Sequence, residues 1–228
     1  MDGSVVSSMS LPEPYYTDEF CTIYHGDSRE LLPLLDADVM VTDPPYGIQH
    51  TGGGFNGARV GVSIVNDHDT NARDNVLESW GVRAALVFGS PLVRMPDGTK
   101  QVLVWQKDSG AGVFGAINGW RRDWEPVYVL GLWPSIPACG SSIFRHDGNR
   151  ADAKTTGHPH AKPQNLMREL IGKCPPGTII DPFMGSGSTL RAAKDLGRKC
   201  IGIEIDAKWC DVAVRRLAQD NLFTDGAA

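Results

Sequence analysis

Long apolar runs are absent from this sequence of 228 residues, because no stretch approaches the ~20 consecutive apolar residues that a membrane-spanning helix requires. The first ten residues carry one acidic and no basic side chain, so they lack the charged start and apolar core of a secretion signal. We therefore expect a cytoplasmic protein with no membrane partner.

Paired cysteines are also missing. The five cysteines are an odd number, no two of them form a Cys-x-x-Cys pair, and no histidine stands at a spacing typical of zinc ligands. His158 and His160 flank a proline, but no further ligand accompanies them. The pattern indicates reduced, buried thiols and no metal site.

Positive charge is scarce as well. The formal net charge of -5 argues against a protein that coats nucleic acid through charge alone. Segment 141–173 is the exception, because it holds six basic and three acidic side chains. Two interpretations of this segment stay open: a face that contacts phosphates, and a solvated irregular loop.

Compact apolar runs alternate with helical patterns along most of the chain, and its length suits one α/β domain over residues 1–228. The patterns predict strands at 20–24, 39–41, 84–88, 102–105, 126–132, 177–181 and 200–205, and helices at 29–35, 70–80, 164–174, 190–196 and 209–218. This alternation favours a doubly wound, mostly parallel sheet with helices on both faces. We expect a poorly ordered amino terminus over 1–18 and a small insertion at 133–161, where periodicity is weak.

The tetrapeptide Asp43, Pro44, Pro45, Tyr46 follows the apolar run 39–41. Two consecutive prolines cannot continue a strand ladder, so the chain leaves the sheet at Asp43. A carboxylate and an aromatic ring then stand at the carboxyl end of a strand, where open α/β sheets bind ligands. The combination suits a planar amino group; the alternative is a strand-ending turn with a packed tyrosine.

A second motif follows the predicted strand 177–181. It begins at Asp181 and continues through a loop that contains Phe183, Gly185, Ser186, Gly187 and Thr189, just before a predicted helix. Glycines let a backbone approach a ligand, and a helix amino end offers free N–H groups. Glu204 ends the next predicted strand, where a carboxylate binds two ribose hydroxyls in nucleotide-binding βαβ units. The third glycine of a dehydrogenase loop is absent, which disfavours that class.

These motifs, in this order, resemble the S-adenosylmethionine-dependent DNA amino-methyltransferases, in the permuted class whose catalytic tetrapeptide precedes the cofactor loop. The resemblance covers roughly residues 20–218. It implies a Rossmann-like fold, S-adenosyl-L-methionine as cofactor and double-stranded DNA as partner. It also implies that Asp43 and a proline carbonyl accept hydrogen bonds from the amino group of a flipped base, while Tyr46 stacks on its ring.

The same resemblance implies roles in cofactor binding. Asp27 would contact the adenine of the cofactor, although a helix cap or turn is the alternative interpretation. Lys162 would lie near the methionine carboxylate, and His158 belongs to the same motif. Asp181 would meet the methionine ammonium, and Phe183 would pack on the cofactor.

The family pattern associates a leading aspartate with adenine more often than with cytosine, so we expect methylation of adenine N6. Cytosine N4 is the alternative, RNA bases and protein amides offer related chemistry, and a catalytically silent module that binds cofactor and DNA also stays open. The room for target recognition at 133–161 is small. The chain thus resembles short enzymes of phages, with lax specificity or with a homodimer that completes the DNA surface.

Overall fold

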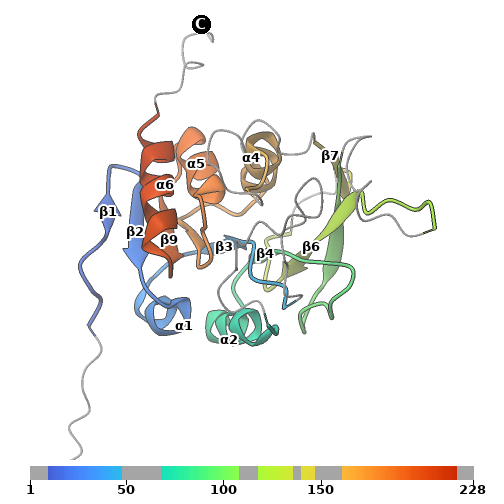
Figure 1. Ribbon diagram of the computed structural model, residues 1–228, viewed down its shortest axis with the longest axis horizontal. Coiled ribbons are helices and arrows are strands. Elements are labelled where there is room, and N and C mark those ends of the chain that lie inside the picture. The colour runs from blue at the N-terminus through green and yellow to red at the C-terminus, as the bar shows by residue number, and fades with distance from the viewer. Residues whose placement is uncertain (1–9, 48–67, 108–117, 136–139, 147–160, 220–228) are drawn as a thin grey trace, which may run out of the picture.

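The computed structural model describes residues 10–47, 68–107, 118–135, 140–146 and 161–219, and these form a nine-stranded sheet flanked by helices (Figure 1). The strands are β1 (Tyr16–Thr17), β2 (Cys21–His25), β3 (Val39–Thr42), β4 (Ala85–Phe88), β5 (Gln101–Gln106), β6 (Trp124–Leu130), β7 (Ile143–Arg145), β8 (Ile179–Asp181) and β9 (Cys200–Glu204). The helices are α1 (Ser28–Leu31), continued by the 3-10 turn η1 (Leu32–Leu34), then α2 (Asn71–Trp80), α4 (Gln164–Gly172), α5 (Ser188–Asp195) and α6 (Ala207–Leu217).

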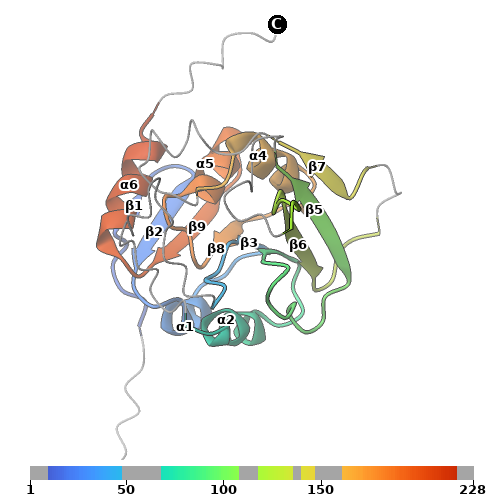
Figure 2. The ribbon, with the colours of Figure 1, turned by 45° about the vertical axis from the view of Figure 1, so that its right-hand side comes forward.

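Strand order in the sheet is β1-β2-β9-β8-β3-β4-β6-β5-β7. The strands from β2 to β4 in that order pair in parallel, whereas β6 lies antiparallel between β4 and β5. Figure 2 shows the parallel strands side by side, with α4, α5 and α6 on one face and α1 and α2 on the other. The predicted fold class, a mostly parallel α/β sheet covered on both faces, is confirmed.

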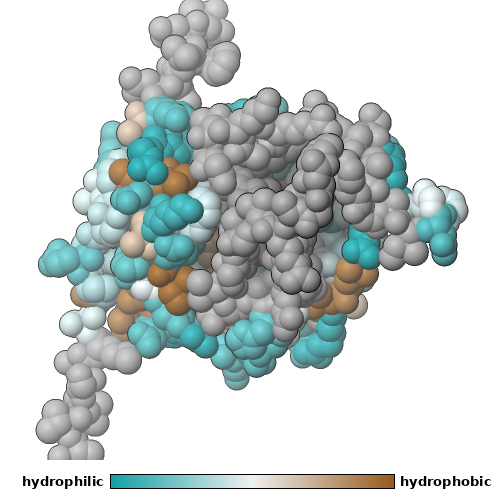
Figure 3. Space-filling model, viewed as in Figure 1, coloured by the Kyte–Doolittle hydropathy of each residue, from teal (hydrophilic) through white to brown (hydrophobic). Residues whose placement is uncertain are grey.

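The central strands are buried on both faces, which explains why they appear in the sequence as unbroken apolar runs. In β3, Val39 and Val41 join the core beneath α4 and α5, and Met40 joins the opposite core beneath α1 and α2. All three side chains have no exposed surface. On the face shown in the space-filling view, the coloured residues are mostly hydrophilic with smaller hydrophobic patches between them, as expected when helices turn their apolar stripes inward (Figure 3).

Two short strands were not predicted. The strand β1 pairs antiparallel with β2, so order begins before residue 18, and residues 1–9 lie outside the described part. The strand β7 lies inside the expected insertion 133–161 and pairs in parallel with β5. Elements of two and three residues are too short to produce a hydrophobic period. Within the described ranges, no helix has the length and apolar character needed to cross a bilayer.

Candidate active site

Four acidic side chains stand at one edge of the sheet. Asp27 follows β2, Glu204 ends β9, Asp181 ends β8, and Asp43 follows β3. These strands are consecutive neighbours in the sheet and run in parallel, so their carboxyl ends meet along one edge. The structure therefore brings the two predicted motifs together.

Asp181 joins the two motifs through hydrogen bonds. Its carboxylate accepts from Thr42 Oγ1 at 2.7 Å, from Thr189 Oγ1 at 2.6 Å and from the Phe183 backbone N–H at 3.1 Å. Burial raises the pKa of Asp181 to about 6, although these hydrogen bonds oppose the rise. Thr42 directly precedes Asp43, so Asp181 holds the start of the tetrapeptide against the glycine loop. Its predicted contact with a methionine ammonium stays a prediction.

The glycine loop has backbone conformations with positive φ, which residues other than glycine adopt poorly. Gly187 has a φ of +76°, and an added Cβ would lie 2.9 Å from Ala213 Cβ. Gly185 has a φ of +50°, and its N–H donates to Glu204 Oε2 at 2.9 Å. Glu204 Oε1 accepts from the Asp206 N–H at 2.9 Å, and burial raises the pKa of Glu204. The carboxylate that was predicted to bind ribose thus also shapes the loop.

A buried acceptor lies beside this loop. Gln164, the first residue of α4, donates its Nε2 to the Ser188 carbonyl at 3.2 Å, which fixes the orientation of its amide. Among the residues that the structure describes, no group donates a hydrogen bond to its buried Oε1. An orphaned acceptor is costly unless a ligand satisfies it. Together with the left-handed glycines, it makes this edge fit a ligand that carries hydrogen-bond donors, as S-adenosylmethionine does.

Asp27 is the N-cap of α1. Its Oδ1 accepts from the Arg29 N–H at 2.9 Å, and the Arg29 guanidinium forms an ion pair with the same carboxylate. The hydrogen bond from the Arg29 side chain lowers the pKa of Asp27. Phe183 packs against the core beneath α1 and α2, and His158 lies outside the described residues. Contacts of these residues with a cofactor stay predictions.

The Asp43 carboxylate already has a partner on each oxygen. Tyr46 donates its hydroxyl to Oδ1 at 2.5 Å, and Lys162 Nζ lies 2.8 Å from Oδ2. Burial, together with the negative charges of Asp43 and Glu125, raises the pKa of Tyr46 well above its usual value. The tyrosine therefore keeps its proton and acts as a donor.

Lys162 lies beside the tetrapeptide, two residues before α4. Its side chain is 8% exposed and makes a second ion pair, to Glu125 Oε2, at 3.0 Å. Burial alone would lower the pKa of Lys162, but Asp43 and Glu125 outweigh burial, so this pKa is raised. The lysine is therefore a permanent cation beside the tetrapeptide.

Sequence reasoning missed Glu125 and Lys107. Glu125 lies near the amino end of β6, and Lys107 follows β5 and approaches Glu125 Oε1 to 2.5 Å. Burial tends to raise the pKa of Glu125, but Lys162 and Lys107 lower it. The sequence did contain a signal for Glu125, because it is an acidic residue near the start of an otherwise apolar predicted strand. Its partners depend on the antiparallel pairing of β5 with β6, which no local pattern shows.

Comparison with known proteins places this geometry in context. Residues 127–215 match the family model of N6/N4 methyltransferases, described as DNA methylase. The chain is 26% identical to the type II methyltransferase M.ScaI of Streptomyces caespitosus, over 91% of this chain and 84% of the relative. It is 24% identical to the type II methyltransferase M2.DpnII of Streptococcus pneumoniae, over 92% of this chain and 94% of the relative.

Solved structures show the same fold. The complex of M1.HpyAVI with SAM has a TM-score of 0.60 at 20% identity and covers 87% of this chain and 100% of that one. The PvuII DNA methyltransferase, which is described as cytosine-N4-specific, has a TM-score of 0.63 at 16% identity, over 92% of this chain and 90% of that one. At these identities the likeness confirms the sheet and its helices, and it leaves the target base open.

Proposed function

We propose that this chain, a DNA methyltransferase of the N6-adenine/N4-cytosine family, transfers a methyl group from S-adenosyl-L-methionine to the exocyclic N6 of adenine in double-stranded DNA. One observation carries the proposal. Asp181 accepts hydrogen bonds from Thr42, which precedes the catalytic tetrapeptide, and from Thr189 in the glycine loop. The residues that would hold a methyl donor and those that would hold an amino acceptor are thus joined by one buried carboxylate.

Asp43 and Pro44 supply the chemistry at the amino group. The lone pair of an exocyclic amine is delocalised into the base, so the nitrogen is a poor nucleophile. When the Asp43 carboxylate and the Pro44 carbonyl accept its two hydrogens, a pyramidal nitrogen is favoured and the lone pair becomes available. This interaction is stronger in the transition state than in the ground state, so it accelerates the reaction.

The bonds balance without a covalent enzyme intermediate. S-adenosylmethionine, when bound, supplies a methyl group on a sulfonium. The amino nitrogen would form a bond to that carbon as the carbon–sulfur bond breaks, the thioether S-adenosylhomocysteine would leave with the bonding electron pair, and the nitrogen would then release one proton to solvent. The base must leave the duplex stack to reach Asp43, and the Tyr46 ring, whose hydroxyl donates to Asp43, would then stack on it.

Residues of β9, α4 and the glycine loop would hold the cofactor. Glu204 accepts from the backbone N–H groups of Gly185 and Asp206. A carboxylate offers about four acceptor sites, so Glu204 retains capacity for a ribose hydroxyl. Gln164 Oε1 is a buried acceptor beside the loop that receives no hydrogen bond from the described part of the chain. We assign the predicted cofactor contacts of Asp27 and Phe183 to the same site as proposals.

Cytosine N4 is the second candidate, because a solved structure with this fold is described as cytosine-N4-specific and the same acceptors suit either amino group. Incubation of the purified protein with methyl-labelled S-adenosylmethionine and unmethylated bacterial DNA, followed by nucleoside mass spectrometry, decides between them. We expect N6-methyladenine. N4-methylcytosine would keep the mechanism and change the base, and absence of any labelled nucleoside despite bound cofactor would refute the DNA methyltransferase.

The DNA surface and the oligomeric state are further parts of the proposal. Residues 133–161 would contact the target, and a homodimer would enlarge the surface that this short segment offers. Light scattering with and without a DNA duplex measures the stoichiometry. A monomer in both conditions would remove the dimer and leave recognition to one copy of the segment.

A further inference from the structure

Each oxygen of the Asp43 carboxylate already has a donor before any substrate arrives. Tyr46 donates to Oδ1 at 2.5 Å, and Lys162 Nζ lies 2.8 Å from Oδ2. The proposed reaction requires one of these oxygens to accept a hydrogen from the amino group of the base. That hydrogen competes with Tyr46 or Lys162 for the same oxygen, so the new hydrogen bond is strongest when one of the two moves away.

Lys162 is the donor with another acceptor within reach. Its Nζ lies 3.0 Å from Glu125 Oε2, so the lysine is shared between two carboxylates. Its position 4.8 Å from the centroid of the Phe88 ring adds further stabilisation of the cation. A buried ammonium needs a charged partner at all times, and Glu125 supplies one when Asp43 does not.

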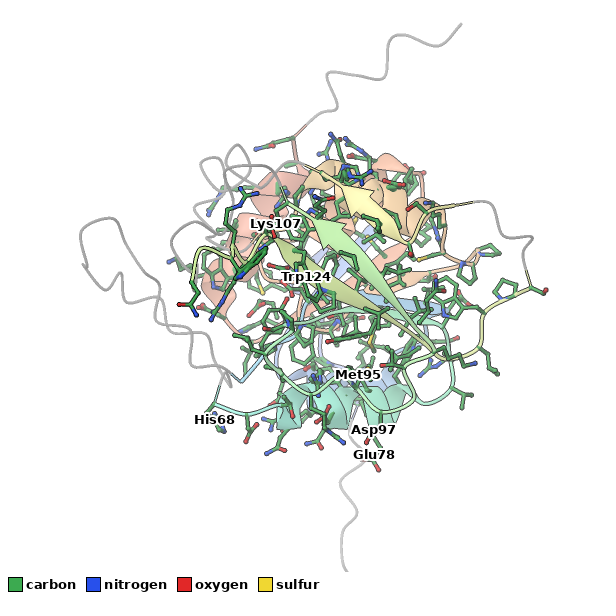
Figure 4. The ribbon with its side chains drawn as sticks, turned by 90° about the vertical axis from the view of Figure 1, so that its right-hand side faces the viewer. His68, Glu78, Met95, Asp97, Lys107 and Trp124 are labelled. Atoms are coloured by element: carbon green, nitrogen blue, oxygen red, sulfur yellow. The ribbon has the colours of Figure 1, made fainter. Side chains whose placement is uncertain are left out.

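Glu125 is itself held from the opposite side. Lys107 approaches Glu125 Oε1 to 2.5 Å and also lies 5.1 Å from the centroid of the Trp105 ring. Figure 4 shows Lys107 beside Trp124 at this edge, where the end of β5 meets the start of β6. The four side chains alternate in charge in the order Lys107, Glu125, Lys162, Asp43. This row of four side chains comes from the ends of the strands β3, β5 and β6 and from the segment before α4.

We propose that Glu125 is a positioning residue that receives Lys162 when the amino group docks on Asp43, and so frees the catalytic carboxylate. This inference rests on the proposed methyl transfer. Movement of Lys162 toward Glu125 also leaves the Asp43 charge less compensated. Positive charge grows on the amino nitrogen as its bond to the methyl group forms, so the uncovered carboxylate stabilises the transition state more than the ground state.

Glu125→Gln tests the inference through kcat. A glutamine cannot hold the buried lysine as strongly, so Lys162 stays on Asp43 and competes with the substrate. We expect kcat to fall about tenfold or more, the factor that a hydrogen bond to a charged group represents, while the Kd for S-adenosylmethionine stays within about twofold. Loss of cofactor affinity with unchanged kcat would overturn the inference, because Lys162 would then serve the methionine carboxylate.

Glu78→Gln is the matched control. Glu78 is exposed on α2, outside the row formed by Lys107, Glu125, Lys162 and Asp43. The same substitution there should leave kcat unchanged. Equal loss of kcat in both variants would mean that carboxylate removal perturbs the fold in general.

The effect of Glu125→Gln on kcat is also measured in a chain that carries Lys162→Met, to test whether Glu125 acts through Lys162. If Glu125 acts through Lys162, Glu125→Gln has no further effect on kcat once Lys162→Met is in place. An equal fold-loss in both backgrounds would show that Glu125 acts by another route and would overturn the inference.

Lys107→Met should change kcat in the opposite direction from Glu125→Gln. It also replaces a partly exposed side chain. Lys107 is 23% exposed, so the variant is expected to fold. Without Lys107, Glu125 attracts Lys162 alone, so kcat should rise above that of wild type, whereas an unchanged or lower kcat contradicts the inference. Wild type is measured alongside: if it transfers no methyl group to DNA, the proposed function fails and this inference fails with it.

Discussion

The two halves of the carboxyl edge use their acidic residues differently. On the β9 and β8 side, Glu204 and Asp181 accept from backbone N–H groups and threonine hydroxyls. On the β3 side, Asp43 and Glu125 pair with the lysine side chains Lys162 and Lys107. Backbone partners hold one geometry, whereas a lysine shared by two carboxylates can change partner. The comparison suggests a preformed cofactor half and an adjustable catalytic half.

The largest expected effect comes from Asp43→Ala, which removes the acceptor in the adjustable half. We expect methyl transfer to fall by roughly a hundredfold or more, because a preorganised group aimed at the transition state is lost. Cofactor affinity should persist, since the β8 and β9 contacts are untouched. Single-turnover transfer and calorimetric titration with S-adenosylmethionine measure the two properties. Retained full activity would contradict the mechanism.

Gly185→Val addresses the preformed half. The backbone φ of Gly185 is +50°, a region in which a β-branched residue is strained, and its N–H orients Glu204. We expect cofactor binding to be lost while the sheet still forms, as judged by circular dichroism. Gly197→Val is the control, because Gly197 has a similar φ of +66° but meets nothing within 4 Å. Equal cofactor affinity in both variants would refute the placement of the loop.

The raised pKa of Asp181, in the preformed half, predicts how the free energy of unfolding depends on pH. Its pKa is raised from 3.8 to about 6 in the folded protein, so folding favours the protonated form. The associated stability is present below pH 4 and is lost as pH rises to 6, by up to roughly 3 kcal/mol. Asp181→Asn does not titrate. Its free energy of unfolding, measured by urea denaturation, should therefore decrease less between pH 4 and pH 7 than that of wild type.

The fold was predictable because its strands are locally distinct. Runs such as Val39 to Val41 are buried on both faces, so each appears as an apolar block bounded by turns. The strands β1 and β7 were not predictable, because their few residues take strand geometry from β2 and β5 as neighbours. Tertiary pairing decides such elements.

The candidate site divides in the same way. Asp43 and the glycine loop were found because each motif is contiguous in sequence and follows a strand. Glu125 and Lys107 were not found, since their roles arise only when β6 folds back between β4 and β5. Lys162 was singled out for the methionine carboxylate, and the structure pairs it with Asp43. Which partner it keeps during turnover is the question that the Glu125 variants answer.

The smallest expected effect concerns Asp27, at the outer end of the cofactor half. As the N-cap of α1 it accepts the Arg29 N–H, and loss of a cap costs about 1 kcal/mol. Asp27→Ala should therefore lower the free energy of unfolding by that amount, whereas Asp27→Asn should preserve it, because asparagine caps equally well. Cofactor affinity separates the two interpretations of this residue. If Asp27 contacts the adenine through its charge, both variants bind S-adenosylmethionine more weakly; if it is a cap alone, Asp27→Asn binds as wild type does.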